Sequence, residues 1–375
     1  MSAVPVLAAR PRTAPTLSVD LAAIAANART FGALTGGRLL AVVKADAFGH
    51  GAVAVARTVL EHGASRLGVA TIGEALVLRS AGIAAPVLSW VNPVAADFEA
   101  AVRARVELAV PSVAHLNAMV AAAASSQTPA RVHVQVDVGM SREGAPRAEW
   151  DALARAARTA ELRGLVEVIG VMGHLPCAED PQHPSNDAGR AAFLEAVVVA
   201  RRAGLRPRIR HLAATAAALS RPDTRFDASR VGAGLYGIDP IGAGGLRGAL
   251  TLTAPVVDVR DVPAGTPVGY GHRHVTTAPT RLALVGLGYA DGIPRSADVA
   301  EVLVHGRRRP VVGVVSMDQT VIDVGDAAVA LGDEVTILGP GDGGEPTVAE
   351  WAAWAHTIPH ELMTGFGSRV TRVHT

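Results

Sequence analysis

The 375-residue sequence has little of what several common classes of protein require. A single cysteine, Cys177, allows no internal disulfide, which indicates a reducing compartment and predicts a cytoplasmic protein. Aromatic residues make up 3% of the chain and the formal net charge is +1, so stacking platforms and basic blocks for nucleic acid are lacking. No apolar run reaches the roughly 18–20 residues of a membrane-spanning helix. We therefore expect neither a nucleic-acid nor a membrane partner.

The N-terminal stretch, residues 1–15, lacks the continuous apolar core of a signal peptide. We expect it to be a flexible tail. The chain as a whole is 49% hydrophobic, with 39 glycines and 18% charged residues, a composition typical of a tightly packed globular protein. Its length predicts two domains, or one barrel with an addition.

Short apolar runs alternate with amphipathic segments over residues 16–243. Segments such as AAFLEAVVVARRAG have the spacing of helices, and the apolar runs between them are candidate strands. The eight candidate strands lie near residues 39–43, 67–70, 87–90, 108–110, 132–138, 166–171, 209–212 and 229–231. Strands that alternate with helices indicate a parallel sheet, and eight such units predict a closed (β/α)8 barrel. A doubly wound open sheet is the alternative.

The pattern changes after the glycine-rich connection IGAGGLRG. Short apolar runs separated by Gly, Pro and Asp turns predict a mainly-β domain over residues 244–375. One helix interrupts them, because Thr347 and Glu350 in PTVAEWAAWA have the spacing of a capping box.

The run AVVKADAFGHGA places Lys44 at the end of the first barrel strand, where reactive groups gather in barrels. Partial burial would favour the neutral amine, which can form a Schiff base with an aldehyde. Thr215, Gly232 and Ala233 follow strands seven and eight, where a hydroxyl and free backbone N–H groups suit a phosphate. Together these features predict a pyridoxal 5′-phosphate site. The alternative for Lys44 alone is a solvated strand end.

Seven segments, in order, resemble those of the alanine racemases, which are pyridoxal-phosphate enzymes of fold type III. The segments are VVKADAFGHG, VDVGMSREG, SRVGAGLYG, VGYGHRH, LGYADGIPR, VVSMDQTVIDVG and TIPHELMT. The resemblance runs from residue 16 to the C-terminus and includes the β domain. It implies an amino-acid racemase that uses pyridoxal 5′-phosphate and no metal, acts on alanine by default in D-alanine biosynthesis, and forms a head-to-tail homodimer.

The resemblance also implies the catalytic roles. Lys44 and the partner subunit's Tyr270 would be the two bases, one on each face of the substrate's α carbon. Arg230 would face the pyridine nitrogen, and His174 would orient Arg230 and the tyrosine. Because a guanidinium keeps its proton, Arg230 would leave that nitrogen unprotonated and the ring a poorer electron sink. Without the resemblance, His174 is more simply interpreted as a core histidine.

Further residues take binding roles by the same resemblance. Arg142 and the backbone N–H of Met317 from the other subunit would hold the substrate carboxylate. Tyr289 would line the substrate channel, and His360 stands where the family has a phosphate-binding tyrosine. The expected cofactor-binding residues are Lys44, His174, Thr215, Arg230, Gly232, Ala233 and His360.

The sequence departs from the family at several site positions. Phe48, Ala214, Gln135 and His360 stand where the family has tyrosine, asparagine, a lysine that is often carbamylated, and tyrosine, and Arg273 and His274 also differ. Each lost neutral hydrogen bond weakens binding by about 0.5–1.5 kcal/mol, a tolerable loss for a covalently held cofactor. These departures leave open a substrate other than alanine, such as a serine-like one. They also leave open another reaction of the cofactor, such as decarboxylation, aldol-type cleavage or hydroxymethyl transfer, and an inactive cofactor-binding protein.

Overall fold

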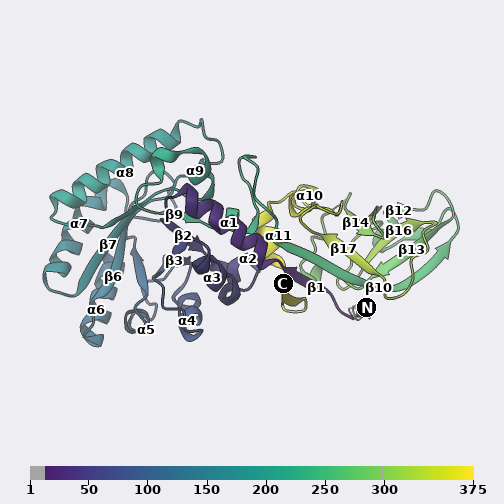
Figure 1. Ribbon diagram of the computed structural model, residues 1–375, viewed down its shortest axis with the longest axis horizontal. Coiled ribbons are helices and arrows are strands. Elements are labelled where there is room, and N and C mark those ends of the chain that lie inside the picture. Colours follow the sequence, from purple (N-terminus) through teal and green to yellow (C-terminus); the bar gives the residue numbers. More distant parts are fainter. Residues whose placement is uncertain (1–12, 298) are drawn as a thin grey trace, which may run out of the picture. The chain divides into compact units, whose positions relative to one another are not determined.

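The computed structural model describes residues 13–375 except residue 298, and divides them into two compact units (Figure 1). One unit spans residues 21–247, and the other joins residues 248–375 to the N-terminal segment that ends at Asp20. The predicted tail falls mainly on residues 1–12, which lie outside the described residues. Within the described residues, no helix is both long and apolar enough to cross a membrane.

The first unit is an eight-stranded parallel sheet that curls into a barrel, as predicted. Its order is β8-β7-β6-β5-β4-β3-β2-β9, so the last strand pairs beside the first. Between the two ends of this order, Arg230 N donates to Ala213 O at 2.9 Å, which brings β9 beside the end of β8. The strands are β2 (Leu39–Val42), β3 (Ala64–Val69), β4 (Val87–Ser89), β5 (Glu107–Val110), β6 (Ala130–Gln135), β7 (Val166–Met172), β8 (Ile209–His211) and β9 (Ser229–Val231). The open-sheet alternative is therefore wrong.

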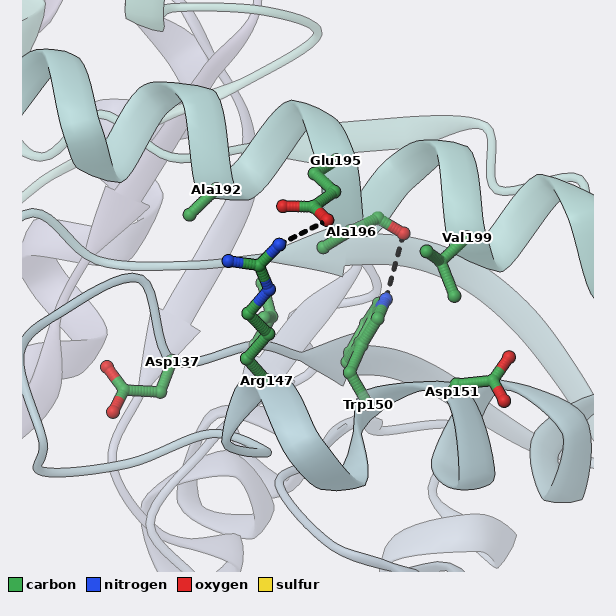
Figure 2. Close-up of a pocket in the computed structure, with 9 residues that line it drawn as sticks. Asp137, Arg147, Trp150, Asp151, Ala192, Glu195, Ala196 and Val199 are labelled. Atoms are coloured by element: carbon green, nitrogen blue, oxygen red, sulfur yellow. Dashed lines mark hydrogen bonds and ion pairs between the residues drawn. The ribbon is translucent and has the colours of Figure 1, made fainter.

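Helices alternate with these strands and cover the barrel. They are α1 (Leu21–Leu34), α2 (Lys44–Phe48), α3 (Ala52–Glu61), α4 (Ile72–Ser80), α5 (Phe98–Arg103), α6 (Val113–Ser126), α7 (Arg147–Leu162), α8 (Ser185–Arg202) and α9 (Thr215–Ser220), with 3₁₀ turns η1 (Pro222–Thr224) and η2 (Ala233–Tyr236). Helices α7 and α8 bound a groove on the outside of the barrel (Figure 2). There Trp150 Nε1 donates to Ala196 O at 2.9 Å, and Arg147 forms an ion pair with Glu195.

The second unit is rich in strands, as predicted. Its main sheet has the order β15-β14-β17-β10-β1-β18, with β13 pairing β10 and β16. The elements are β10 (Leu250–Val262), β11 (Pro267–Val268), η3 (Tyr270–His272), β12 (His274–Val275), β13 (Thr280–Val285), η4 (Tyr289–Asp291), β14 (Glu301–Val304), β15 (Arg307–Pro310), β16 (Thr320–Gly325), β17 (Glu334–Leu338), α10 (Val348–Trp354), α11 (Pro359–Gly365) and β18 (Thr371–His374). The predicted capping box of α10 is confirmed, with Glu350 N donating to Thr347 Oγ1.

Strand β1 (Thr16–Val19) belongs to this second sheet, although the sequence placed residues 16–20 with the barrel. Leu17 pairs with Leu252 of β10 in an antiparallel register and with Arg372 of β18 in a parallel one. The side chains of Leu17 and Val19 are fully buried. The burial of these two side chains and the pairing on both sides hold the segment in the sheet-rich unit.

Candidate active site

Lys44 comes two residues after β2, at the carboxyl end of the barrel strands, as predicted. Lys44 begins α2, and the residues that follow it there form a turn of left-handed helix. Ala45, Asp46, Ala47 and Phe48 all have φ between 51° and 55°. Left-handed backbone costs roughly 1–2 kcal/mol per non-glycine residue, so surrounding contacts must hold this turn in place.

Polar contacts fix both ends of the left-handed turn. The Ala45 N–H donates to Glu74 Oε1 at 2.6 Å, and the other oxygen of Glu74 accepts from the first turn of its own helix, α4, in a capping box with Thr71. At the far end, Asp46 Oδ1 accepts from the Ala52 N–H at 2.7 Å. Helices α3 and α4 therefore clamp the segment that carries Lys44.

Aromatic packing between Phe48 and Tyr236 also holds the same turn. The Phe48 ring stacks on Tyr236, with ring centroids 4.7 Å apart, and the Tyr236 hydroxyl donates to Val42 O at 2.9 Å. Phe48 therefore serves as packing for the turn and brings no hydroxyl to the site. The Tyr236 hydroxyl is hydrogen-bonded to the backbone of β2.

The Lys44 side chain is half-buried and surrounded by charge. Burial lowers the pKa of Lys44, the positive charge of Arg142 lowers it further, and Glu143 and Glu74 oppose the change. A larger share of the amine is therefore neutral near physiological pH than in a solvated lysine. This is the property that a lysine needs to attack an aldehyde or to accept a proton.

Arg230 lies on β9, beside the lysine strand β2, and 4% of its surface is exposed. Its terminal nitrogens donate to the carbonyl groups of Gly173, His211 and Leu212, and to the imidazole Nδ1 atoms of His174 and His211. Among the described residues these contacts all involve Nη1 and Nη2, so the Nε–H group remains as a donor. Burial and the charge of Arg142 lower the pKa of Arg230 to about 10, which still leaves it cationic at neutral pH.

His174 follows β7 and accepts a hydrogen bond at Nδ1 from Arg230 Nη2 at 3.2 Å. Burial and the charge of Arg230 lower the pKa of His174 to about 3, so its imidazole is neutral at physiological pH. Because Arg230 donates to Nδ1, the proton of the neutral ring sits on Nε2. The structure thus brings His174 and Arg230 together, as the sequence predicted.

Thr215 begins α9 and lies against the turn that follows β9. Its hydroxyl oxygen accepts from the N–H groups of Gly232 and Gly234, at 3.3 Å each. The expectation that the Gly232 N–H is free was therefore wrong, because α9 approaches β9 closely enough for the hydroxyl to reach it. A Cβ on Gly232 would lie 3.1 Å from the Phe48 ring, so this turn also packs against the segment after Lys44. Thr215, Gly232 and Ala233 form one polar corner of the barrel mouth.

Arg142 lies in the loop between β6 and α7, with its side chain 55% exposed. Its Nε is 3.9 Å from Glu143 Oε1, and Gln135 Nε2 donates to the second oxygen of Glu143 at 3.3 Å. Gln135 Oε1 is buried and receives no hydrogen bond from the described residues. At the position where the resemblance implies a lysine that is often carbamylated, this chain therefore places an amide that contacts Glu143.

The remaining predicted site residues lie in the sheet-rich unit. Tyr270 begins η3, between β11 and β12, and is 69% exposed. Met317 and Tyr289 are also exposed, and they lie on neighbouring loops, since Ala290 N donates to Met317 O. His360 lies in the first turn of α11 and is partly buried.

Two features at the candidate site were missed from the sequence. Glu74, which holds the turn after Lys44, is at N3 of α4, and its capping pattern with Thr71 was a readable signal. Glu107, His133 and His211 lie inside the barrel in contact with one another, and only their polarity within apolar strands could have pointed to them. Within residues 13–375 apart from 298, no cluster of His, Cys, Asp or Glu has the arrangement of a metal site.

Two family descriptions match this chain. "Alanine racemase, N-terminal domain" matches residues 19–240, and "Alanine racemase, C-terminal domain" matches residues 249–374. An alanine racemase of Thermobifida fusca is 46% identical over 362 residues, which cover 95% of this chain and 97% of the relative. An alanine racemase of Mycolicibacterium smegmatis is also 46% identical, covering 95% of this chain and 93% of the relative.

Solved structures of similar proteins agree. The alanine racemase from D-cycloserine producing Streptomyces lavendulae superposes with a TM-score of 0.95 at 41% identity, covering 97% of both chains. The alanine racemase from Bartonella henselae, solved with covalently bound pyridoxal phosphate, superposes with a TM-score of 0.87 at 28% identity. That superposition covers 97% of this chain and 100% of the other.

Proposed function

The chain belongs to the alanine racemase family, and from this premise we propose that Lys44 and the partner subunit's Tyr270 interconvert L- and D-alanine as a pair of bases. The protein is a pyridoxal-phosphate-dependent isomerase. The observation that carries the proposal is the half-buried Lys44, whose pKa is lowered, held on a strained turn beside Arg230.

The residues at the barrel mouth fit the coenzyme. Lys44 supplies an amine for its aldehyde, Arg230 a guanidinium for its ring nitrogen, and Thr215 with Gly232 and Ala233 a hydroxyl and N–H groups for its phosphate. The 3.3 Å contacts among these last groups are long for hydrogen bonds, so a phosphate ester would displace them at little cost. When bound, the coenzyme supplies an electron sink that makes the α proton of an amino acid acidic.

The two bases hold and return the α proton on opposite faces. Lys44 Nζ takes up the proton on one face as a neutral amine, the form that burial favours, and returns a proton from the ammonium that results. The phenol oxygen of the partner's Tyr270 does the same on the other face. The exposure of Tyr270 supports a role outside its own unit, because a proton-transferring group needs a dry environment that a 69% exposed ring does not have.

Arg230 and Arg142 do not transfer the proton. With its pKa at about 10, Arg230 stays protonated at neutral pH and only donates hydrogen bonds, so it would leave the ring nitrogen of the coenzyme unprotonated and the electron sink modest. Such a donor would favour return of the proton to the α carbon over side reactions of the coenzyme. Arg142 offers its exposed guanidinium to the substrate carboxylate, and the N–H of the partner's Met317 would be the second donor.

We further propose that the protein acts as a head-to-tail homodimer in the cytoplasm, with the sheet-rich unit contributing the second base. Its single cysteine supports the reducing compartment. His360 would contact the coenzyme phosphate in the place of a tyrosine.

Conversion of L-alanine to D-alanine by the purified, coenzyme-loaded protein, followed by chiral chromatography, tests the proposed function. We expect alanine to be converted faster than serine or larger amino acids, without loss of carbon dioxide or aldehyde. A Lys44→Ala variant should bind no coenzyme that borohydride can fix to the chain. Decarboxylation or aldol cleavage with no racemisation would contradict the proposal, and so would coenzyme binding with no turnover.

A further inference from the structure

Three side chains inside the barrel form a continuous line of hydrogen bonds that ends at Arg230. His133 Nε2 is 3.0 Å from Glu107 Oε2, His133 Nδ1 is 2.9 Å from His211 Nε2, and His211 Nδ1 is 3.0 Å from Arg230 Nη1. Glu107, His133 and His211 have no exposed surface. We call these three residues the buried relay.

The barrel strands set the direction of the relay. Glu107 is the first residue of β5, His133 lies in the middle of β6, and His211 is the last residue of β8. Because the strands are parallel, the line runs from the amino end of the barrel toward the carboxyl end, where Lys44 lies. Arg66 and Arg131 contact the Glu107 carboxylate at the starting end and are 17% and 35% exposed.

A glycine makes room for this line. Gly170 lies on β7, between the strands of His133 and His211. A Cβ at position 170 would lie 2.4 Å from His133 Nδ1, closer than real Cβ atoms approach other heavy atoms. The contact between the two imidazoles therefore depends on the missing side chain at position 170.

Donor and acceptor chemistry fixes every proton in the line. A guanidinium can only donate, so His211 Nδ1 must be an acceptor. Burial lowers the pKa of both histidines, so each ring is neutral and carries one proton. His211 then holds its proton on Nε2 and donates to His133 Nδ1, which leaves the His133 proton on Nε2, directed at Glu107.

The order of protons along the buried relay requires an acceptor at its far end, and ionised Glu107 is that acceptor. Burial opposes its ionisation, but the hydrogen bond from His133 and the charge of Arg66 outweigh burial and lower the pKa of Glu107 to about 2. A carboxylate accepts and cannot donate, so the line has a single orientation from the Arg230 cation to the Glu107 anion.

We propose that the buried relay positions Arg230 for the reaction, by fixing the proton of His211 on Nε2 so that Nδ1 always accepts from the guanidinium. This inference rests on the proposed function, in which Arg230 faces the ring nitrogen of the coenzyme. Glu107, His133 and His211 are positioning residues, since they act through Arg230. Without the relay, His211 could present an N–H to the guanidinium and push it out of place.

Imidazole nitrogen NMR on the holoenzyme, labelled with ¹⁵N-histidine, tests the proposal. His133 and His211 should both be neutral Nε2–H tautomers from pH 6 to 9, with their signals assigned from His133→Gln and His211→Gln variants. Glu107→Gln keeps the shape of the side chain but can also donate, so it should populate the Nδ1–H tautomer of His133. The same variant should change the absorbance band of the bound coenzyme and lower kcat about tenfold, with KM for alanine within about twofold.

Glu161→Gln is the matched control. Glu161 lies on α7, where it contacts Arg158 and the Val168 N–H, so this variant should change neither tautomer nor kcat. An Nδ1–H tautomer of His211 in the wild type would overturn the proposal, and that measurement decides the question even if Glu107→Gln fails to fold. Tautomers that shift with unchanged kcat, or kcat that falls with unchanged tautomers, would also overturn it. A wild type that does not racemise alanine would instead contradict the proposed function and leave the tautomers to be tested separately.

Discussion

Burial and the positive charge of Arg142 both lower the pKa values of three groups at the mouth of the barrel. The charge of Arg142 lowers the pKa of Lys44, of Arg230 and of His174, in each case after the larger effect of burial or of another neighbour. Glu143 opposes this effect at Lys44 and Arg230. A pair of adjacent residues, Arg142 and Glu143, therefore tunes the Lys44 amine in opposite directions.

The opposite effects of Arg142 and Glu143 on the pKa of Lys44 predict that two substitutions shift the pH dependence of coenzyme uptake in opposite directions. Only the neutral amine attacks an aldehyde, so the rate at which coenzyme-free protein takes up pyridoxal 5′-phosphate should rise as the pH rises through the pKa of Lys44. Arg142→Gln removes a charge that lowers this pKa and should move the rise to higher pH. Glu143→Gln removes a charge that raises it and should move the rise to lower pH.

Stopped-flow absorbance over a range of pH measures both shifts. Arg147→Gln is the control, because Arg147 is 84% exposed in the groove between α7 and α8 and contacts Glu195 (Figure 2). It should leave the profile in place. Shifts of the same sign in the Arg142 and Glu143 variants would show that these charges do not act on Lys44 as described.

At the scale of elements, the left-handed turn after Lys44 stores strain close to the reacting groups. Four consecutive non-glycine residues with φ above 50° are unfavourable by themselves, and contacts with Glu74, with Ala52 and with the Tyr236 ring hold them. These contacts, against the preference of the backbone itself, hold the residues after Lys44 in this conformation.

A glycine at Ala45 should relieve part of this strain. Ala45 is exposed, with φ of 51°, so Ala45→Gly should raise the free energy of unfolding by about 0.5–1 kcal/mol. The same change at Ala121, exposed in the middle of α6, should lower it by about 1 kcal/mol. Denaturant unfolding measures the free energy of unfolding of both variants. A lower value for both would show that the backbone at Ala45 is not strained.

Sequence patterns predicted the barrel because most of its strands lie in short apolar runs that alternate with helical segments. They placed β1 in the wrong unit, because its partners Leu252 and Arg372 lie far along the chain. A short apolar run does not by itself indicate which sheet it joins. The left-handed turn also could not be predicted, since alanines carry no turn signal and tertiary contacts impose the conformation. Glu107 and His133 resemble outward-facing polar residues of a strand, and only the closed barrel shows that they point inward.

At the scale of the whole molecule, the proposed reaction is divided between two subunits. Lys44 and Arg230 belong to the barrel unit, whereas Tyr270 and Met317 belong to the sheet-rich unit. If each site takes Lys44 from one subunit and Tyr270 from the other, a dimer of two different inactive variants has one complete site.

Mixed dimers test this division. A heterodimer of Lys44→Ala and Tyr270→Phe, isolated with two affinity tags, should recover about half of the wild-type activity per dimer, since one of its two sites is intact. A wild-type dimer carrying the same tags sets the reference. A heterodimer no more active than its parents would place both bases in the same subunit.

Deuterium exchange at the α carbon of alanine tests the two-base reaction most directly. In deuterium oxide, the wild type should incorporate deuterium from either enantiomer and convert each into the other. With Tyr270→Phe we expect exchange to persist for one enantiomer, without inversion, because Lys44 still serves its own face. If that variant still inverted alanine, or still exchanged the α proton of both enantiomers, Tyr270 would not be a base. The two-base reaction would then be wrong.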